Sequence, residues 1–356
     1  MSVNGTMVDN EIIQRVISIG DRLGTTPDVK VAQISLFALI AQMISVAAEL
    51  GIADLIKNGH GEIDELARLS NANPEALYRL MRALAGFGIF AESADKQFEL
   101  TPLAECLATD STYTIRSQMI SANLRYRAWN ELLHSVKTGE VAFNQAFGME
   151  VFKYLYLPEN AYITQHFSRS FMEAWRMIFG NIVAIYDFSQ FSKIIDVGGN
   201  HGLLLETILR ADNKLQGVLF DLPTVVELTK MRLAAVGLSD RCETLAGNFF
   251  ESVPSGGDAY ILSQVIHDWD DEKSTVILQN CRRAMTVDGK LLVIEMLLQP
   301  GNNPSLGKVM DVEMLVMTGG RERTEEQYRQ LFKSAGLQVS HTIKTDTLLI
   351  LEGVVA

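Results

Sequence analysis

Cysteine, positive charge and uninterrupted apolar runs are all scarce in this chain of 356 residues. The three cysteines, Cys106, Cys242 and Cys281, lie far apart, form no CxxC pair and have no histidine nearby at metal-binding spacing. This pattern favours reduced thiols in a cytoplasmic protein over a disulfide framework. It also gives no reason to expect a metal site.

Basic residues are outnumbered, with 31 Lys and Arg against 43 Asp and Glu, a net charge of −12 and a pI near 5.0. A protein whose main role is to grip phosphate backbones needs a clustered basic face. The composition therefore disfavours nucleic-acid binding. Apolar residues make up 47% of the chain, which supplies a sizeable core, and the length suits two domains.

The sequence shows no basic segment followed by an apolar block at its start, so we expect no signal peptide. The most apolar early run, residues 31–56, is interrupted by Gln33 and Gln42 and closed by acids. Those interruptions favour a buried helix or a subunit interface over a membrane span. We expect a soluble protein that does not associate with a membrane.

The first third of the chain is predicted to be helical except for one hairpin. A helix over about 31–50 ends at a glycine, a short helix at 63–69 meets a turn, and a second helix follows at 74–86. Two short strands at 88–92 and 97–100 complete the outline of a winged helix. Residues 112–185 continue as helix, rich in large apolar side chains, most of them core and several able to line a cavity between domains.

A winged helix raises the possibility of DNA binding. However, the second helix offers only Arg79 and Arg82, and the hairpin tip offers one Lys beside an Asp. A scaffold or dimerisation role is the stronger alternative. We therefore predict three regions, with a dimerisation domain at 1–110, a helical connector at 111–185 and a separate C-terminal domain at 186–356.

From residue 192 strands and helices alternate, which predicts a mainly parallel sheet covered on both faces. The predicted strands lie in 193–199, 216–223, 242–250, 259–269, 289–297 and 345–354, and the predicted helices lie in 202–211, 223–236, 272–286 and 324–336.

A glycine-rich turn follows the first of these strands in "IIDVGGNHG". Its glycines miss the dinucleotide spacing, and no Lys-Ser or Lys-Thr follows as in a Walker loop. The spacing of Asp196, Gly198, Asn200 and Gly202 instead resembles the loop that bends beneath S-adenosylmethionine in class I methyltransferases. Asn200 tolerates the left-handed conformation that such a turn needs.

The next strand ends support this interpretation. Asp221 closes "GVLFD", where an acid accepts hydrogen bonds from ribose hydroxyls, although it is equally placed to cap the following helix. Asn248 and Phe249 in "GNFF" close the third strand, where an adenine would lie. Successive strand ends therefore predict one nucleoside site.

His267 and Asp268 follow a fourth strand in "IHDWDDE". Imidazole is the usual general base near neutral pH because its unperturbed pKa is about 6.5. Glu295, which ends "LLVIE", and Glu322 in "GGRERTEEQ" are candidates to orient it. The alternatives are a buried Glu295 paired with an arginine and a surface Glu322 at a helix start.

Together these stretches identify a resemblance. The chain resembles the caffeate/hydroxyindole type of S-adenosylmethionine-dependent O-methyltransferase, in its bacterial branch, over nearly its whole length. The resemblance implies an α/β fold, in which a C-terminal Rossmann-like class I methyltransferase sheet follows an all-helical, winged-helix N-terminal dimerisation domain. The stretches that carry it are "IIDVGGNHG", "FDLP", "GNFFESVP", "IHDWDDE", "VIEMLL" and "TGGRERTEEQY", with "AFGMEVFKY" and "FSRSF" upstream.

The resemblance also implies roles for single residues. His267 is the expected catalytic base, Glu295 and Glu322 flank it, and Asp268 helps to hold the substrate; no metal is expected. The expected cofactor contacts are Asp196, Gly198, Gly199, Asp221, Leu222, Asn248, Phe249 and Ser263. The expected walls of the acceptor pocket are Met119, Phe167, Phe171, Trp175, Met314, Met317 and Thr318.

Two departures from the family stand out. Asn248 replaces an Asp that relatives often have, and Ser263 stands where plant relatives have Lys. Neither change affects the base. The predicted reaction is SN2 transfer of a methyl group from S-adenosylmethionine to a phenolic or enolic hydroxyl of a small molecule in secondary metabolism, with S-adenosylhomocysteine as product. The alternative is a repurposed member, a cofactor-bound hydroxylase, decarboxylase, cyclase or C-methyltransferase. A homodimer through the N-terminal domain is expected.

Overall fold

The computed structural model describes residues 26–345 and 347–356. Two compact units make up the chain, one formed by Met1–Leu124 with Ala161–Ala174 and the other by Arg125–Asn160 with Trp175–Ala356. Two helices, α7 (Arg116–Trp129) and α11 (Ala161–Ile185), pass from one unit into the other. The bounds of the three predicted regions stay predictions.

The first unit is helical apart from one hairpin, as expected. Its start and stop signals are local: Asn73 Oδ1 accepts the Ala76 N–H at 3.0 Å, and Pro74 opens the following helix. The hairpin begins later than predicted because Gly88 adopts a left-handed turn with φ +78°. The elements are α2 (Pro27–Glu49), α3 (Ile52–Lys57), α4 (Ile63–Leu69), α5 (Pro74–Gly86), β1 (Phe90–Ala94), β2 (Gln97–Leu100) and α6 (Pro102–Glu105).

Among the described residues, α2 is the one helix that is both long enough and apolar enough to cross a membrane, judged by length and composition only. Its second half is buried at Ile40, Ala47 and Ala48, whereas Val31 and Ile34 near its start are 69% and 67% exposed. The prediction of a buried helix therefore holds for the second half alone. The exposed apolar half is the part that fits the predicted subunit interface.

The second unit contains a seven-stranded sheet in the order β5-β4-β3-β6-β7-β9-β8. Strands β5, β4, β3, β6 and β7 run parallel to one another, and β9 runs antiparallel to both of its neighbours, β7 and β8. The predicted mainly parallel sheet is confirmed. The strands are β3 (Lys193–Val197), β4 (Gln216–Asp221), β5 (Cys242–Ala246), β6 (Ala259–Ser263), β7 (Lys290–Met296), β8 (Leu337–Lys344) and β9 (Leu348–Val355).

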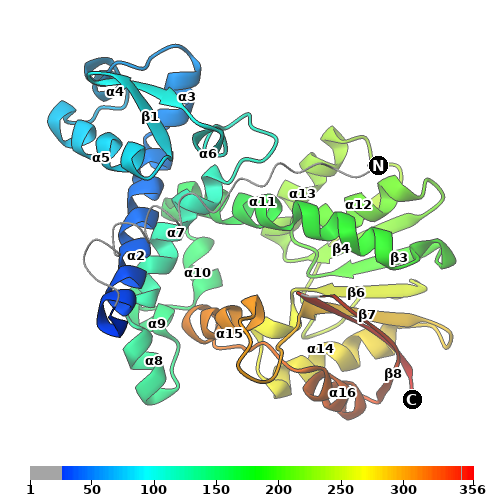
Figure 1. Ribbon diagram of the computed structural model, residues 1–356. Coiled ribbons are helices and arrows are strands. Elements are labelled where there is room, and N and C mark those ends of the chain that lie inside the picture. Colours follow the sequence, from blue (N-terminus) through cyan, green and yellow to red (C-terminus); the bar gives the residue numbers. More distant parts are fainter. Residues whose placement is uncertain (1–25, 346) are drawn as a thin grey trace. The chain divides into compact units, whose positions relative to one another are not determined.

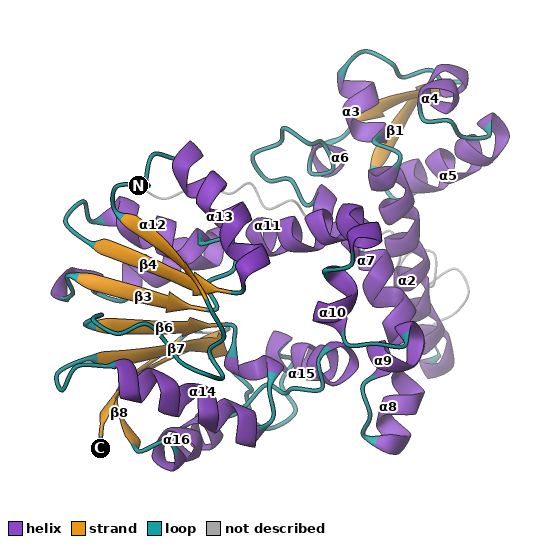
Figure 2. Cartoon of the chain, turned by 180° about the vertical axis from the view of Figure 1, so that it is seen from behind, coloured by secondary structure: helices purple, strands orange, loops and turns teal. Residues whose placement is uncertain are grey.

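Helices cover both faces of this sheet (Figure 1). Ile194 of β3 packs on the side of α12 and α13, and its neighbour Ile195 packs on the side of α14 and α16, because successive side chains of a strand point to opposite faces. Figure 2 shows the same layers from behind. The helices are α8 (Leu132–Thr138), α9 (Ala142–Phe147), α10 (Val151–Leu155), α12 (Leu203–Ala211), α13 (Pro223–Ala235), α14 (Asp271–Ala284), α15 (Leu306–Met317) and α16 (Glu325–Ser334), with short 3-10 turns η1 (Pro158–Asn160), η2 (Phe188–Gln190) and η3 (Ile266–Asp268).

This topology places the carboxyl ends of β3, β4, β5, β6 and β7 along one edge of the sheet. Loops that follow these strands are where open α/β sheets bind ligands. Strand β8 and helix α15 were not predicted. Strand β8 is an edge strand whose side chains are mostly half-buried or exposed, so its apolar pattern is weak.

A close approach in the antiparallel part of the sheet yields a stability prediction. Any Cβ at Gly353 would overlap the ring of Phe332, a fully buried residue of α16. We expect Gly353→Ala to lower the free energy of unfolding by about 1–3 kcal/mol through overpacking. Gly180→Ala is the matched control, because Gly180 lies in α11 with open space at its Cβ, and it should stabilise by about 0.5–1 kcal/mol. Urea unfolding measures both, and an unchanged Gly353→Ala would contradict the packing.

Candidate active site

The glycine-rich turn after β3 depends on left-handed backbone. Gly198, Asn200 and Gly202 have φ of +72°, +50° and +70°, so two positions need glycine and the third takes the asparagine that tolerates this region. A Cβ at Gly199 would lie 2.6 Å from Asp196 Oδ2. The turn therefore folds directly over the carboxylate of Asp196.

Two acids stand behind this turn. Asp196 is buried, and burial together with the charge of Asp221 raises its pKa to about 7. Asp221 accepts the N–H of Asn200 at 2.8 Å and that of Leu222 at 2.7 Å. The alternative role of Asp221 as a helix cap is wrong, because α13 begins after Leu222 without a side-chain cap. Each oxygen of Asp221 keeps a further lone pair, which is the capacity a ribose diol needs.

The next two strand ends lie beside the same turn. The ring of Phe249 and the side chain of Val265 approach Gly198 closely enough that a Cβ there would meet them at 3.6 and 3.0 Å. Asn248 Oδ1 accepts the Phe250 N–H at 3.0 Å. Ser263 Oγ, at the end of β6, is buried and has no hydrogen-bond partner among the described residues. A buried hydroxyl without a partner is unusual and fits a missing ligand.

His267 lies in η3, directly beyond β6, and its ring nitrogens have different surroundings. Nδ1 lies 3.1 Å from Glu322 Oε1 and 3.2 Å from Glu295 Oε2. Nε2 lies 3.9 Å from Asp268 Oδ1. Because Nδ1 faces two acceptors, it carries the proton, and Nε2 is the nitrogen whose lone pair is available to accept another.

The two carboxylates also determine how readily the ring holds a second proton. Burial by itself would lower the pKa of His267, but the charge of Glu295 and hydrogen bonds to Glu295 and Glu322 outweigh it and raise the pKa well above 6.5. Burial raises the pKa of Glu322, while its hydrogen bond to His267 opposes that shift. The site therefore favours an imidazolium once a proton has been taken up.

Glu295 is the penultimate residue of β7, is fully buried and is held by main-chain donors. Its Oε1 accepts the N–H groups of Val265, Ile266 and His267 at 3.2, 2.8 and 3.4 Å. The alternative in which an arginine pairs with this acid is therefore wrong. Three converging N–H donors stabilise a negative charge there without a second side-chain cation.

Glu322 follows α15 on a segment that wraps around the histidine. It is 2% exposed, so the alternative of a surface acid is wrong. Its N–H donates to Asp311 Oδ1 at 3.0 Å, and the N–H of Arg321 donates to the carbonyl of His267 at 2.8 Å. The main chain of this segment thus holds Glu322 against the ring.

Asp268 and the end of α15 lie on the Nε2 side. Burial raises the pKa of Asp268 to about 6, although the charge of His267 and a hydrogen bond with Thr318 oppose the shift. The hydroxyl of Thr318 in turn bonds to the carbonyl of Met314 at 3.3 Å, and Met314 and Met317 are buried. Asp268 and Thr318 therefore present polar atoms beside the free nitrogen.

The remaining predicted pocket residues are distributed between the two units. Trp175 is buried in the core of the second unit and stacks on Phe179, with their ring centroids 5.5 Å apart. Met119, Phe167 and Phe171 belong to the first unit, where Phe171 remains 39% exposed. Their predicted contact with an acceptor stays a prediction.

Three residues that shape this site were not predicted. Gln264 adopts a left-handed conformation with φ +56°, and its side-chain amide donates to Glu295 Oε2 at 3.2 Å. Strained backbone of this kind collects at functional sites. Asp311 and Arg323 anchor the segment around Glu322. Arg323 stands in a quoted motif, but one sequence gives no sign of its burial.

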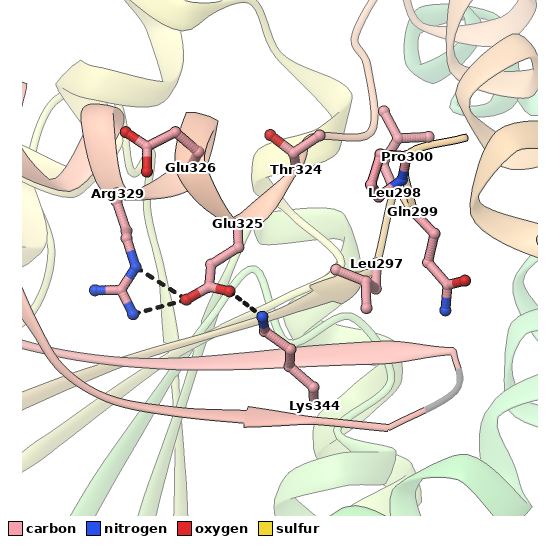
Figure 3. A pocket seen from close by; sticks show the side chains of 9 residues that line it. All are labelled: Leu297, Leu298, Gln299, Pro300, Thr324, Glu325, Glu326, Arg329 and Lys344. Atoms are coloured by element: carbon pink, nitrogen blue, oxygen red, sulfur yellow. Dashed lines mark hydrogen bonds and ion pairs between the residues drawn. The ribbon is translucent and has the colours of Figure 1, made fainter.

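A cavity of about 410 Å³ lies apart from the predicted site residues. Figure 3 shows Glu325 between Arg329 and Lys344, with which it forms ion pairs. These charges satisfy one another, so the cavity offers no evident recognition of a charged ligand. Its lining residues are Leu297, Leu298, Gln299, Pro300, Thr324, Glu325, Glu326, Arg329 and Lys344.

Comparison with known proteins agrees with this geometry. A family model of the O-methyltransferase domain matches residues 129–338, and one of the O-methyltransferase dimerisation domain matches residues 33–110. This chain belongs to the O-methyltransferase family. It is thus an S-adenosylmethionine-dependent methyltransferase with the class I methyltransferase fold, as the sequence predicted.

Individual relatives are similar over most of the chain. Phenazine O-methyltransferase PhzM of Lysobacter antibioticus is 42% identical over 311 residues, which cover 86% of this chain and 89% of the relative. The crystal structure of LaPhzM has a TM-score of 0.89 at 38% identity, covering 93% of this chain and all of its own. The O-methyltransferase NcsB1 from neocarzinostatin biosynthesis was solved with S-adenosyl-L-homocysteine and 1,4-dihydroxy-2-naphthoic acid. Its structure has a TM-score of 0.79 at 30% identity, and the match covers 89% of this chain and 96% of NcsB1.

His267, Glu295 and Glu322 lie close enough together to be considered as metal ligands, with their ligand atoms within 4.8 Å of one another. We nevertheless expect no bound metal, because N–H donors of the ring and of residues 264–267 already account for the close approach. Elemental analysis of the purified protein should find less than stoichiometric metal, and EDTA should leave methyl transfer unchanged. One equivalent of zinc per chain, with activity lost to EDTA and restored by zinc, would contradict this expectation.

Proposed function

We propose that this enzyme transfers the methyl group of S-adenosylmethionine to a phenolic or enolic hydroxyl of a small molecule in secondary metabolism. The observation that carries the proposal is the environment of His267, with Nδ1 on two buried carboxylates and Nε2 available at the ligand edge of the sheet. This is the arrangement of a general base with its tautomer fixed.

The residues at the strand ends fit the cofactor. A Cβ at Gly199 would overlap the carboxylate of Asp196, so the main chain of the turn packs directly on that acid, and a main chain without side chains at Gly198 and Gly199 suits close approach of the cofactor's amino-acid part. Asp221 has acceptor capacity for ribose hydroxyls, and Leu222 follows it with 41% of its surface exposed. Asn248 and Phe249 are assigned to the adenine, and the unpartnered Ser263 Oγ to a polar cofactor atom.

The cofactor supplies a methyl group that its sulfonium charge has already activated, so the protein needs mainly to align the reactants and accept a proton. His267 Nε2 takes the proton of the acceptor hydroxyl. The imidazolium that results is stabilised by Glu295 and Glu322 through Nδ1. A phenol, whose pKa is about 10, lies within reach of a base whose own pKa is raised.

Asp268 and Thr318 are proposed to orient the acceptor hydroxyl beside Nε2, and the buried Met314 and Met317 of α15 to pack against a flat ring. The family match to the dimerisation domain and the exposed apolar start of α2 support a homodimer. We keep a cytoplasmic location as a prediction.

The direct test is product analysis. Purified enzyme, S-adenosylmethionine and a panel of phenols, hydroxynaphthoates and enols should yield S-adenosylhomocysteine together with an O-methylated product, identified by mass spectrometry and NMR. A product that is hydroxylated, decarboxylated, cyclised or methylated on carbon would support the repurposed alternative instead.

Removing the base should separate binding from chemistry. We expect His267→Ala to bind S-adenosylmethionine with nearly unchanged affinity, because the polar partners of the ring are Asp268, Glu295 and Glu322 and not the proposed cofactor residues, and to lose about 10²–10⁴-fold in kcat. Calorimetry and single-turnover kinetics measure the two quantities. Near-full methylation by this variant would rule out the assignment of the base.

The pH dependence follows from the charges around the ring. His267 must be neutral to accept a proton, and its raised pKa means that it becomes neutral only above pH 6.5. The acidic limb of kcat/KM should therefore lie above pH 6.5. Glu322→Gln removes one charge that holds the proton, so the limb should move to lower pH. A limb that stays fixed in this variant would contradict the proposed coupling.

A further inference from the structure

Arg323 is the largest side chain that the structure buries completely among the described residues, with 1% of its surface exposed. Guanidinium groups are almost never buried unless their N–H donors and their charge find partners. A buried arginine directly after Glu322, which contacts the ring of His267, therefore needs a specific explanation. Its partners supply one.

The guanidinium holds both ends of the turn that carries the base. Nη1 donates to the carbonyl of Ile266 at 3.1 Å, and Nη2 donates to the carbonyl of Trp269 at 2.8 Å. These two carbonyls bracket His267 and Asp268 in the chain. A planar fork with fixed donor directions is suited to hold two such acceptors at a set separation.

The charge of Arg323 is compensated elsewhere. Asp271 Oδ1 accepts from Nε at 3.0 Å and from Nη2 at 2.7 Å. Asp271 is the first residue of α14, and its side chain is 60% exposed. The arginine therefore takes its counter-ion from the surface, and its other donors reach the main chain of the turn, the carbonyl of Arg321 and the hydroxyl of Ser274.

The neighbouring residues of the same segment reach the same turn. The N–H of Arg321 donates to the carbonyl of His267 at 2.8 Å. Gly320 packs so closely on the main chain of His267 and Asp268 that a Cβ would overlap it. Residues 320–323 thus contact the main chain of the turn before, at and after the histidine. Within this segment, Glu322 contacts the ring of His267.

We propose that Arg323 is a positioning residue for the base: it fixes the turn at residues 266–269 against its own segment and so sets the contact between His267 Nδ1 and Glu322. The inference rests on the proposed function only in taking His267 as the base. It deepens that function by assigning the geometry of the base to a residue that touches neither cofactor nor acceptor.

The test uses the full-length enzyme and two substitutions. Arg323→Lys keeps the charge but cannot span two carbonyls, and Arg323→Met removes both charge and donors. Arg329→Met is the matched control, because Arg329 lies on α16, is bonded to Glu325 and Thr342, and is 40% exposed. All three should still bind S-adenosylmethionine, measured by calorimetry.

The decisive readout is the pH titration of the His267 ring by NMR in histidine-labelled protein. We expect the midpoint to fall toward 6.5 in both Arg323 variants and to stay at the wild-type value in Arg329→Met. Once an acceptor that the wild-type enzyme methylates has been identified, kcat of Arg323→Lys should fall about 10²-fold with little change in KM, since displacing a catalytic group by about 1 Å lowers the rate by about that factor. Wild-type titration together with kcat within about threefold of wild type in Arg323→Lys would overturn the proposal.

Misfolding and failure of the proposed function remain distinguishable. If both Arg323 variants fail to fold, Asp271→Asn weakens the same guanidinium from the surface and should shift the ring's midpoint in the same direction; an unshifted midpoint there overturns the proposal. The titration needs no acceptor. A wild-type enzyme that methylates no hydroxyl would therefore refute the proposed function. The titration midpoint of the His267 ring in the Arg323 variants would still test the positioning role.

Discussion

The second unit of this protein depends on one contact, that between His267 Nδ1 and two buried carboxylates. Glu295 and Glu322 lie 3.2 and 3.1 Å from the same nitrogen, and both acids are almost completely buried. Two acids without solvent around one ring would be costly by themselves. The surrounding structure offsets that cost on each side, and the way it does so explains much of the architecture.

The two acids are stabilised in different ways. Glu295 lies near the end of the interior strand β7 and receives three main-chain N–H groups from the turn that carries the histidine, so the strand and the turn fix one another. Glu322 lies on an irregular segment that Gly320, Arg321 and Arg323 attach to the main chain of the same turn. One acid is thus held by the sheet and the other by a loop. A histidine ring positioned from two independent elements has little freedom to turn away, which is what the proposed base requires.

At the strand ends that are proposed to hold the cofactor, main-chain N–H groups again hold a carboxylate. Asp221 accepts N–H groups from the glycine turn and from Leu222, which joins β3 to β4 while leaving lone pairs for a ligand. Small residues and left-handed backbone at Gly198, Asn200 and Gly202 let the turn pass close to Asp196 and Phe249. The residues that hold the turn together are therefore the same ones that are proposed to bind the cofactor.

The sequence by itself determined the order of most strands and helices, the glycine turn, and the grouping of His267 with Glu295 and Glu322, because each rests on short-range patterns or family motifs that tertiary packing did not override. Asp196, Asp221 and His267 follow apolar strands directly, and parallel strands bring their ends to one edge. Only the tertiary structure decided that Glu322 is buried, that main-chain groups rather than an arginine hold Glu295, and that Asp221 does not cap a helix. It also revealed Arg323, Gln264 and strand β8. The physical reason is that burial and hydrogen-bond partners depend on residues far apart in the chain, such as 266 and 323, which no local spacing reports.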